Sequence, residues 1–387
     1  MVLHRWIGSA EMRSLRRLLC LLRPWMLAAL SFVLIAVAGG CAYSPAGLPL
    51  IDASGYDGAV HQVLVATSRA ETDNPVLRFG DERADQISYE EVMVWTPADR
   101  EPGAVVYPSK DPKPAKEFAV TGVERISKGQ FEARLRQQLD LLSGAKTAFL
   151  FVHGYNVPYA NGIYRHAQVI EDFDATGVAI HYSWPSSGRS LGYLYDRDSV
   201  QFARDGLVEV LEACEAAEVD NIFLMGHSMG TLLVMEALRQ LSLTKREAVL
   251  RRVSPLVLAS PDIDADVFRS QFRAVDPKPE PVVVFVSRKD GALKLSERLR
   301  GGQARIGDGK NIQSLQDLGI VVIDLSKLKK GEGTNHSAFA SSPTLIRALR
   351  QVNVAEQTQG DADRQGNRLN PLRALRDLTD GIVYIPE

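Results

Sequence analysis

The chain has 387 residues, enough for one large folded domain with additional segments at its ends. Apolar residues make up 45% and charged residues 24%, and the formal net charge is −2 at pH 7, which is the composition of an ordinary globular protein. Beyond the N-terminal region, charges of both signs are interspersed along the chain, so the sequence does not predict a nucleic-acid partner.

The N-terminal region predicts export to the cell envelope. A run of arginines between residues 13 and 23 precedes an uncharged stretch over residues 24–40, the order found in a secretory signal. The stretch ends in Val37-Ala38-Gly39-Gly40-Cys41, which resembles a bacterial lipobox in which Cys41 becomes lipidated and N-terminal. The alternative is an uncleaved anchor helix, because a stretch of about 17 uncharged residues is close to the shortest that spans a bilayer.

A lipidated Cys41 would anchor the protein in the membrane, facing the periplasm. The residue after the cysteine is Ala42 instead of an aspartate, which favours the outer membrane.

Composition divides the chain into four segments. We expect a signal or membrane anchor over residues 1–41, followed by a flexible tether over residues 42–58, which are rich in Ser, Pro and Gly. The folded domain is expected over residues 59–352. The polar composition of residues 353–387 predicts a C-terminal tail that is mostly disordered.

Short apolar segments alternate with amphipathic segments through most of the folded domain. Two early segments rich in β-formers, residues 61–66 and 91–96, predict strands. From residue 130 onward, the alternation predicts an α/β fold with a doubly wound, mostly parallel sheet and helices on both faces. The predicted strands here are residues 147–152, 178–182, 221–225, 255–259, 282–286 and 320–325, and the predicted helices are residues 130–142, 160–173, 199–217, 229–241, 292–299 and 342–351.

The pentapeptide Gly226-His227-Ser228-Met229-Gly230 lies between a predicted strand and a predicted helix. Glycines on both sides of the serine permit a sharp turn in which strand and helix approach closely. This is the setting of a nucleophile elbow, which presents a serine hydroxyl at the carboxyl end of the sheet. We therefore predict that Ser228 is the nucleophile of a serine hydrolase with the α/β-hydrolase fold.

A serine hydroxyl needs a base that removes its proton, and the base needs an acid that orients it. His336 is the only histidine after Ser228, and the hydrolase order Ser, acid, His selects it as the base. Asp290 closely follows a predicted strand at the usual place of the acid, where it would also suit a helix N-cap. Asp262 and Asp264 follow the preceding strand and stay open as alternatives.

Two backbone N–H groups must stabilise the oxyanion that forms during the reaction. We predict that Met229, directly after the nucleophile, and Tyr155, in His153-Gly154-Tyr155-Asn156, provide them. Tyr155, Trp184 and Tyr193 are predicted to line an open substrate cleft, although each would also suit the core. No cysteine, histidine or carboxylate cluster has metal-ligand spacing, so we expect neither a metal nor a cofactor.

With these motifs, the sequence resembles a bacterial group of α/β-hydrolases of unknown function in the esterase/lipase superfamily. The likeness runs from Val63-Leu64-Val65-Ala66-Thr67-Ser68-Arg69 through Phe151-Val152-His153-Gly154-Tyr155-Asn156 and the Ser228 pentapeptide to Ala259-Ser260-Pro261-Asp262-Ile263-Asp264 and His336. The resemblance implies the fold and the catalytic triad, but it implies no particular substrate.

We expect an enzyme that cleaves a carboxylic ester of a small molecule or lipid through an acyl-enzyme on Ser228. An acyltransferase or a thioesterase would use the same triad, and the sequence does not separate these activities. A non-catalytic envelope lipoprotein that keeps the fold as a binding module is the remaining alternative, and a missing triad residue would have favoured it.

Overall fold

The computed structural model describes residues 47–189, 191–299, 302–327, 336–343, 345–347 and 383–384. The predicted signal or anchor over residues 1–41 lies outside these residues, as does most of the predicted tail over residues 353–387. Within the described ranges, no helix combines the length and the hydrophobicity needed to cross a membrane.

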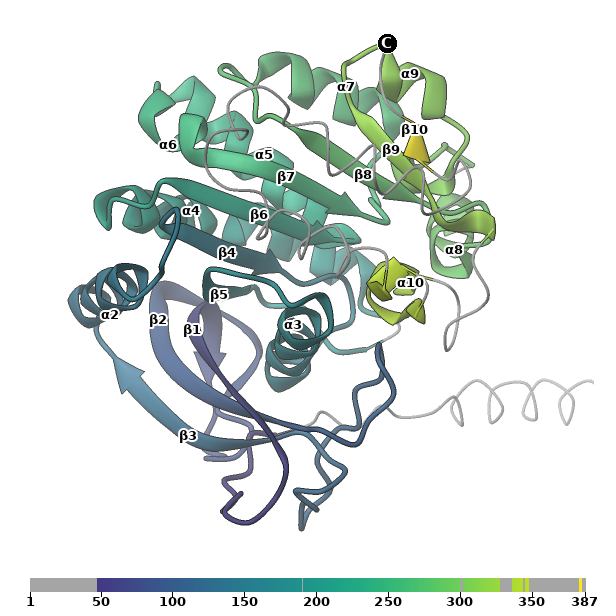
Figure 1. The fold of residues 1–387 in the computed structure, drawn as a ribbon. Helices are drawn as coiled ribbons and strands as arrows, with labels where there is room; N and C mark the ends of the chain where they lie inside the picture. The colour runs from purple at the N-terminus through teal and green to yellow at the C-terminus, as the bar shows by residue number, and fades with distance from the viewer. Residues whose placement is uncertain are drawn as a thin grey trace, which may run out of the picture. The chain divides into compact units, whose positions relative to one another are not determined.

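Apolar strands buried on both faces form the centre of the sheet (Figure 1). Parallel strands covered by helices on both sides need apolar side chains pointing both ways, and this is why they read as continuous apolar runs. All six strands predicted in this region are confirmed, with ends shifted by at most two residues. They are β4 (Thr147–Val152), β5 (Val178–Ser183), β6 (Asn221–His227), β7 (Val253–Ala259), β8 (Val282–Val286) and β9 (Val321–Asp324).

Antiparallel strands extend the sheet at both edges. β1 (Gly58–Glu71) is parallel to β5 and antiparallel to β2 (Phe79–Pro97), which pairs with β3 (Ala119–Ile126). The two early predicted strands lie within β1 and β2 but are shorter, because the outer parts of these long strands carry polar residues. The prediction missed β3, which contains Gly122 and charged residues, and did not place β10 (Val383–Tyr384), which pairs with β9.

Helices cover both faces of the sheet (Figure 1). The helix predicted from residue 199 begins six residues earlier, at Tyr193, and α6, α7, α9 and α10 were not predicted. Half of the predicted helix over residues 342–351 lies outside the described residues, and residues 343 and 345–347 of the described half are helical. The helices are α2 (Lys128–Asp140), α3 (Tyr159–Phe173), α4 (Tyr193–Ala216), α5 (Met229–Leu243), α6 (Glu247–Arg252), α7 (Ala265–Ala274), α8 (Gly291–Leu299), α9 (Ile312–Gln316) and α10 (Ala338–Ser341), with the 3-10 turns η1 (Ile306–Asp308) and η2 (Leu325–Lys327).

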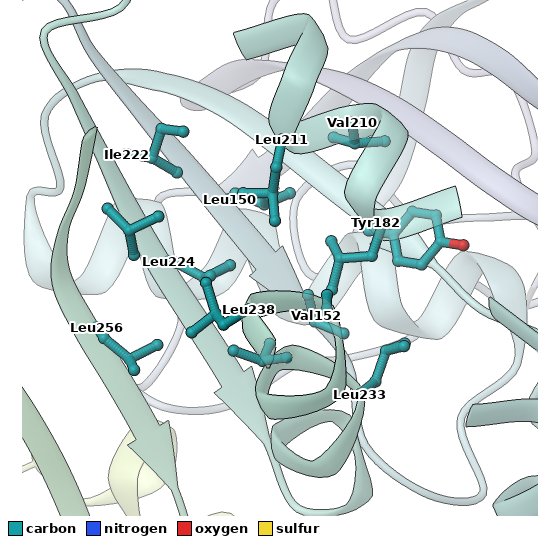
Figure 2. Close-up of a cluster of buried hydrophobic side chains, with 14 of the residues drawn as sticks. Leu150, Val152, Tyr182, Val210, Leu211, Ile222, Leu224, Leu233, Leu238 and Leu256 are labelled. Atoms are coloured by element: carbon teal, nitrogen blue, oxygen red, sulfur yellow. The ribbon is translucent and has the colours of Figure 1, made fainter. Parts of the chain in front are cut away.

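The core is divided between the two faces because side chains alternate along each strand. Leu150 and Val152 of β4 belong to a cluster with residues of α4 and α5, including Leu233 (Figure 2). Phe149 and Phe151 belong to a second cluster that includes residues of α3 and α10. Burial on both sides fixes the register of β4, and with it the position of the loop that follows.

Part of the predicted tether is held against the domain. Leu48 is buried and its N–H donates to the carbonyl oxygen of Val76 at 2.7 Å. The N–H of Ile51 donates to the carbonyl oxygen of Val120 at 2.9 Å. Ordered contacts therefore begin within the segment 42–58.

The strand order in the sheet is β10-β9-β8-β7-β6-β4-β5-β1-β2-β3. The chain leaves β4 toward β5 on one side and then returns to β6 on the other side of β4. In open α/β sheets, ligands bind at the carboxyl ends of the strands where the order reverses in this way. The segments that follow β4 and β6 therefore lie where a site is expected.

Candidate active site

Ser228 forms the turn between β6 and α5. Its φ of 53° and ψ of −124° are strained for a residue with a side chain. Its N–H donates to the carbonyl oxygen of Ala259 at 2.9 Å, and its own carbonyl oxygen accepts from the N–H of Thr231 at 3.0 Å. The residue is the N-cap of α5 and thus lies at the positive end of that helix dipole.

Glycines allow the loop after β4 to touch this turn. A Cβ on Gly154 would lie 2.8 Å from the Cβ of Ser228. A Cβ on Gly230 would overlap the carbonyl oxygen of His153 and lie 2.8 Å from that of Val152. Both distances are shorter than real Cβ contacts, so only glycine fits, and the predicted oxyanion loop lies directly against the predicted nucleophile.

The structure brings His336 and Asp290 together. His336 Nδ1 lies 2.7 Å from Asp290 Oδ2, with the carboxylate buried. The other oxygen, Oδ1, accepts the N–H groups of Ala292 and Leu293, both at 3.0 Å. Asp290 therefore caps α8 and orients the imidazole at once, which leaves His336 Nε2 as the nitrogen that can exchange a proton.

Two opposing effects set the pKa of His336. Burial lowers it, but the Asp290 charge and hydrogen bond, with a further contribution from Asp262, raise it above its ordinary value. A base with a raised pKa is a stronger proton acceptor once it is neutral.

His227, within the elbow, contacts His336 directly. Burial lowers the pKa of His227 well below its usual range, so its ring is neutral. Its Nε2 lies 3.2 Å from the carbonyl oxygen of His336, to which it donates, and the two ring centroids are 4.9 Å apart. In the described residues, Ser228 Oγ makes no hydrogen bond with His336, a contact that often forms only with substrate bound.

The alternative acids have other partners. The carboxylate of Asp264 caps α7 by accepting the N–H groups of Asp266 at 2.9 Å and Val267 at 3.2 Å. Asp262 is buried and accepts the hydroxyls of Tyr193 at 2.9 Å and Ser296 at 2.7 Å. Neither carboxylate is hydrogen-bonded to His336.

The two predicted oxyanion donors belong to the two segments that meet at Ser228. Met229 is the first residue of α5, and the first N–H groups of a helix have no acceptor within it. Tyr155 follows Gly154, the residue packed on Ser228. The ring of Tyr155 packs edge-on against Tyr193 at 5.6 Å, and its hydroxyl donates to the carbonyl oxygen of Arg189 at 3.2 Å. Burial raises the pKa of the Tyr155 phenol to about 12, so this hydroxyl stays protonated.

The structure places the three predicted substrate contacts differently. Trp184 is fully buried, stacked on His153 at 5.0 Å, and its Nε1–H donates to the His153 carbonyl oxygen at 2.7 Å. It therefore supports the loop after β4. Tyr193 is also buried, with its hydroxyl among Asp262 and Ser296. Of the three, Tyr155 alone is partly exposed.

Arg69, at the end of β1, was not singled out as a site residue from the sequence. It is fully buried, which lowers its pKa to about 10 and leaves it charged at neutral pH. The only signal in the sequence was its place at the end of an apolar strand motif. Its guanidinium donates to the carbonyl oxygens of Gly80 (2.8 Å), Val157 (2.7 Å) and Ser186 (3.0 Å) and to the hydroxyl of Ser183 (2.9 Å). It thus joins the loops after β4 and β5 to the start of β2.

The arrangement is suited to nucleophilic catalysis. A strained serine at a helix N-terminus lies beside a histidine–carboxylate pair and an anchored loop. Among the residues whose positions are described, no group of three or more histidine, cysteine or acidic side chains could hold a metal ion.

Comparison with known families identifies the fold. A sequence model described as alpha/beta hydrolase of unknown function (DUF900) matches residues 127–353, more than half of the chain. The chain belongs to this family. The matched region of this α/β-hydrolase contains Ser228, Asp290, His336 and both predicted oxyanion donors, and the family description supports hydrolase chemistry in general terms.

Several solved structures are similar to this α/β-hydrolase. Est1E from Butyrivibrio proteoclasticus is 10% identical, with 70% of this chain and 96% of that chain covered and a TM-score of 0.37. Dienelactone hydrolase from Anabaena variabilis is 13% identical, with 69% and 90% covered and a TM-score of 0.35. RedJ-thioesterase from Streptomyces coelicolor is 18% identical, with 55% and 91% covered and a TM-score of 0.30. The comparison with curated proteins gives no significant match.

Proposed function

We propose that this α/β-hydrolase cleaves carboxylic esters through an acyl-enzyme on Ser228. The observation that carries the proposal is the 2.7 Å hydrogen bond between His336 and Asp290 beside the strained Ser228 turn. A buried carboxylate held by a helix cap and aimed at a histidine Nδ1 is the arrangement that fixes the imidazole as a base.

The proposed reaction has two steps. His336 Nε2 takes the Ser228 proton as Oγ attacks the ester carbon, and the N–H groups of Met229 and Tyr155 stabilise the oxyanion. The C–O bond to the alcohol then breaks, and His336 returns the proton to the leaving oxygen. Water attacks the acyl-enzyme with His336 as base again, which releases the carboxylic acid and restores Ser228.

Water is our proposed acceptor because the family is described as one of hydrolases. An acyltransferase or a thioesterase would form the same type of acyl-enzyme, and product analysis with added alcohols or with thioesters separates these activities from ester hydrolysis.

Labelling with a fluorophosphonate probe tests the nucleophile. The full chain in detergent should label, and so should Ser54→Ala, a control at an exposed serine. Ser228→Ala should not label, and His336→Ala should label far more slowly because the base is missing. An unlabelled wild type, or equal labelling of Ser228→Ala, contradicts the proposal. Hydrolysis of p-nitrophenyl esters of rising chain length then measures the size of the acyl pocket.

We further propose that Cys41 is lipidated and holds the enzyme in the bacterial envelope, facing the periplasm. The support is the sequence pattern over residues 24–41. Cells fed labelled palmitate should incorporate it into the wild type and into Cys20→Ser, the matched control, but not into Cys41→Ser. Incorporation that survives Cys41→Ser would refute lipidation at this residue, and density fractionation of the two membranes tests the outer-membrane expectation.

A further inference from the structure

Arg305, just before η1, is a buried arginine without hydrogen bonds. Its side chain is 1% exposed, and none of its three side-chain nitrogens has a hydrogen-bond partner among the described residues. A guanidinium carries five N–H donors, and buried donors left without acceptors strongly disfavour a structure. The side chain therefore calls for an acceptor that the described residues do not provide.

The charge of Arg305, in contrast, is already balanced. Its Nε lies 3.4 Å from Oδ1 of Asp262, which is also buried. The carboxylate of Asp262 is engaged by the hydroxyls of Tyr193 and Ser296. Asp262 supplies the counter-charge but makes no hydrogen bond with Nη1 or Nη2 of Arg305. The guanidinium therefore lacks a neutral hydrogen-bond acceptor, not a second negative charge.

This group lies next to the nucleophile. The N–H of Asp262 donates to the carbonyl oxygen of Ser228 at 3.3 Å. The Arg305 segment runs alongside the same loop, since the N–H of Ile306 donates to the carbonyl oxygen of Ile263 at 3.0 Å. Ser260, which has a positive φ of 48° and directly follows β7, carries a second buried polar atom without a partner, its Oγ.

We propose that Arg305 and Ser260 form a subsite for a neutral oxygen acceptor of the substrate, a carbonyl or hydroxyl oxygen in the acyl or the alcohol half of the ester. This inference rests on the proposed esterase function and names its substrate class: oxygenated esters in preference to plain alkyl esters. A carboxylate is disfavoured because it would add a negative charge beside Asp262.

Two matched pairs of esters test the subsite. p-Nitrophenyl pentanoate and p-nitrophenyl 4-oxopentanoate differ in the acyl half, and pentyl butanoate and 4-oxopentyl butanoate differ in the alcohol half. A hydrogen bond to a charged donor corresponds to a factor of about ten or more. The wild type should therefore show at least about that increase in kcat/KM, corrected for intrinsic ester reactivity, for the keto member of one pair.

Variants assign the preference to Arg305. Arg305→Met keeps an apolar stem and should hydrolyse both members of the pair equally. Because this change leaves Asp262 without a counter-charge, the double variant Arg305→Met/Asp262→Asn serves where the single variant fails to fold. Arg269→Met, at an exposed ion pair on α7, is the control and should keep the wild-type preference.

The outcomes separate the subsite from the enzyme itself. p-Nitrophenyl acetate is too short to reach a second site, so its hydrolysis reports only the proposed function. If this ester is not cleaved, the proposed function and the subsite are both refuted. Acetate cleavage with no keto preference in either pair overturns the subsite alone and leaves internal water as the partner of Arg305. A preference for the p-nitrophenyl monoester of succinic acid over the keto ester overturns the neutral acceptor.

Discussion

Replacing Gly154 by alanine should push the loop after β4 away from Ser228. The added Cβ would start 2.8 Å from the Cβ of Ser228, whereas ordinary contact begins at 3.4 Å, so the two segments must separate by about 0.6 Å, the difference between these distances. A displacement of about 1 Å in an active site can lower the rate on the order of a hundredfold. We therefore expect kcat to fall roughly ten- to a hundredfold.

The effect should fall on kcat more than on KM, because oxyanion donors stabilise the transition state more than the bound ester. The free energy of unfolding should drop by about 1–3 kcal/mol, as for other overpacked sites. Steady-state kinetics with p-nitrophenyl acetate and urea unfolding measure the two quantities.

Gly129→Ala is the matched control. A Cβ on Gly129, in the first turn of α2, meets no atom within 4 Å. Activity should be unchanged, and the free energy of unfolding should stay the same or rise by up to about 1 kcal/mol. A Gly154→Ala enzyme that folds and keeps the kcat of the wild type would refute the placement of this loop as the oxyanion loop.

Further predictions concern the groups around the site. Asp290→Asn should lower kcat by about 10⁴-fold, as loss of the orienting carboxylate does. In the wild type, kcat/KM should fall as the pH drops through the pKa of His336, which lies above the ordinary value of about 6.5, because only the neutral ring accepts the serine proton. A pH profile should show this inflection at a lower pH in Asp290→Asn. Arg69→Lys should lower both kcat and the urea midpoint, because one ammonium cannot replace a guanidinium bound to four groups on separate segments. Burial lowers the pKa of His166 and of His181 well below the ordinary value, so at acidic pH the unfolded chain binds protons that the folded chain does not. The free energy of unfolding should therefore fall below about pH 6.5, by up to about 1.4 kcal/mol per pH unit for each ring. Urea unfolding near neutral pH and about two units lower measures this loss, which should be smaller in His166→Leu than in the wild type.

The central strands and the Ser228 turn were predictable from the sequence because each depends on local patterns. Strands buried on both faces need consecutive apolar residues, and the elbow needs glycines at fixed positions around the serine. The pairing of His336 with Asp290 was reachable by elimination, since one histidine follows Ser228. The structure places the two side chains in contact, while their catalytic role rests on the proposed function.

Other features depend on contacts between distant segments, which one sequence does not reveal. Trp184 is an aromatic residue of the kind that often contacts substrates. Its burial against His153 depends on a contact between two separate loops. The sequence did not mark Arg69 or Arg305, because their burial arises from loops far apart in the chain. β10 could not be placed because a two-residue strand carries no periodic pattern, and its partner β9 lies some sixty residues earlier.

The most direct test of the central role of Ser228 is to trap the acyl-enzyme. Wild-type enzyme quenched within the first turnover of p-nitrophenyl acetate should carry one acetyl group on the peptide that contains Ser228, and Ser228→Ala should carry none. Acetylation of another residue with Ser228 unmodified, or turnover by Ser228→Ala at the wild-type rate, would contradict the account.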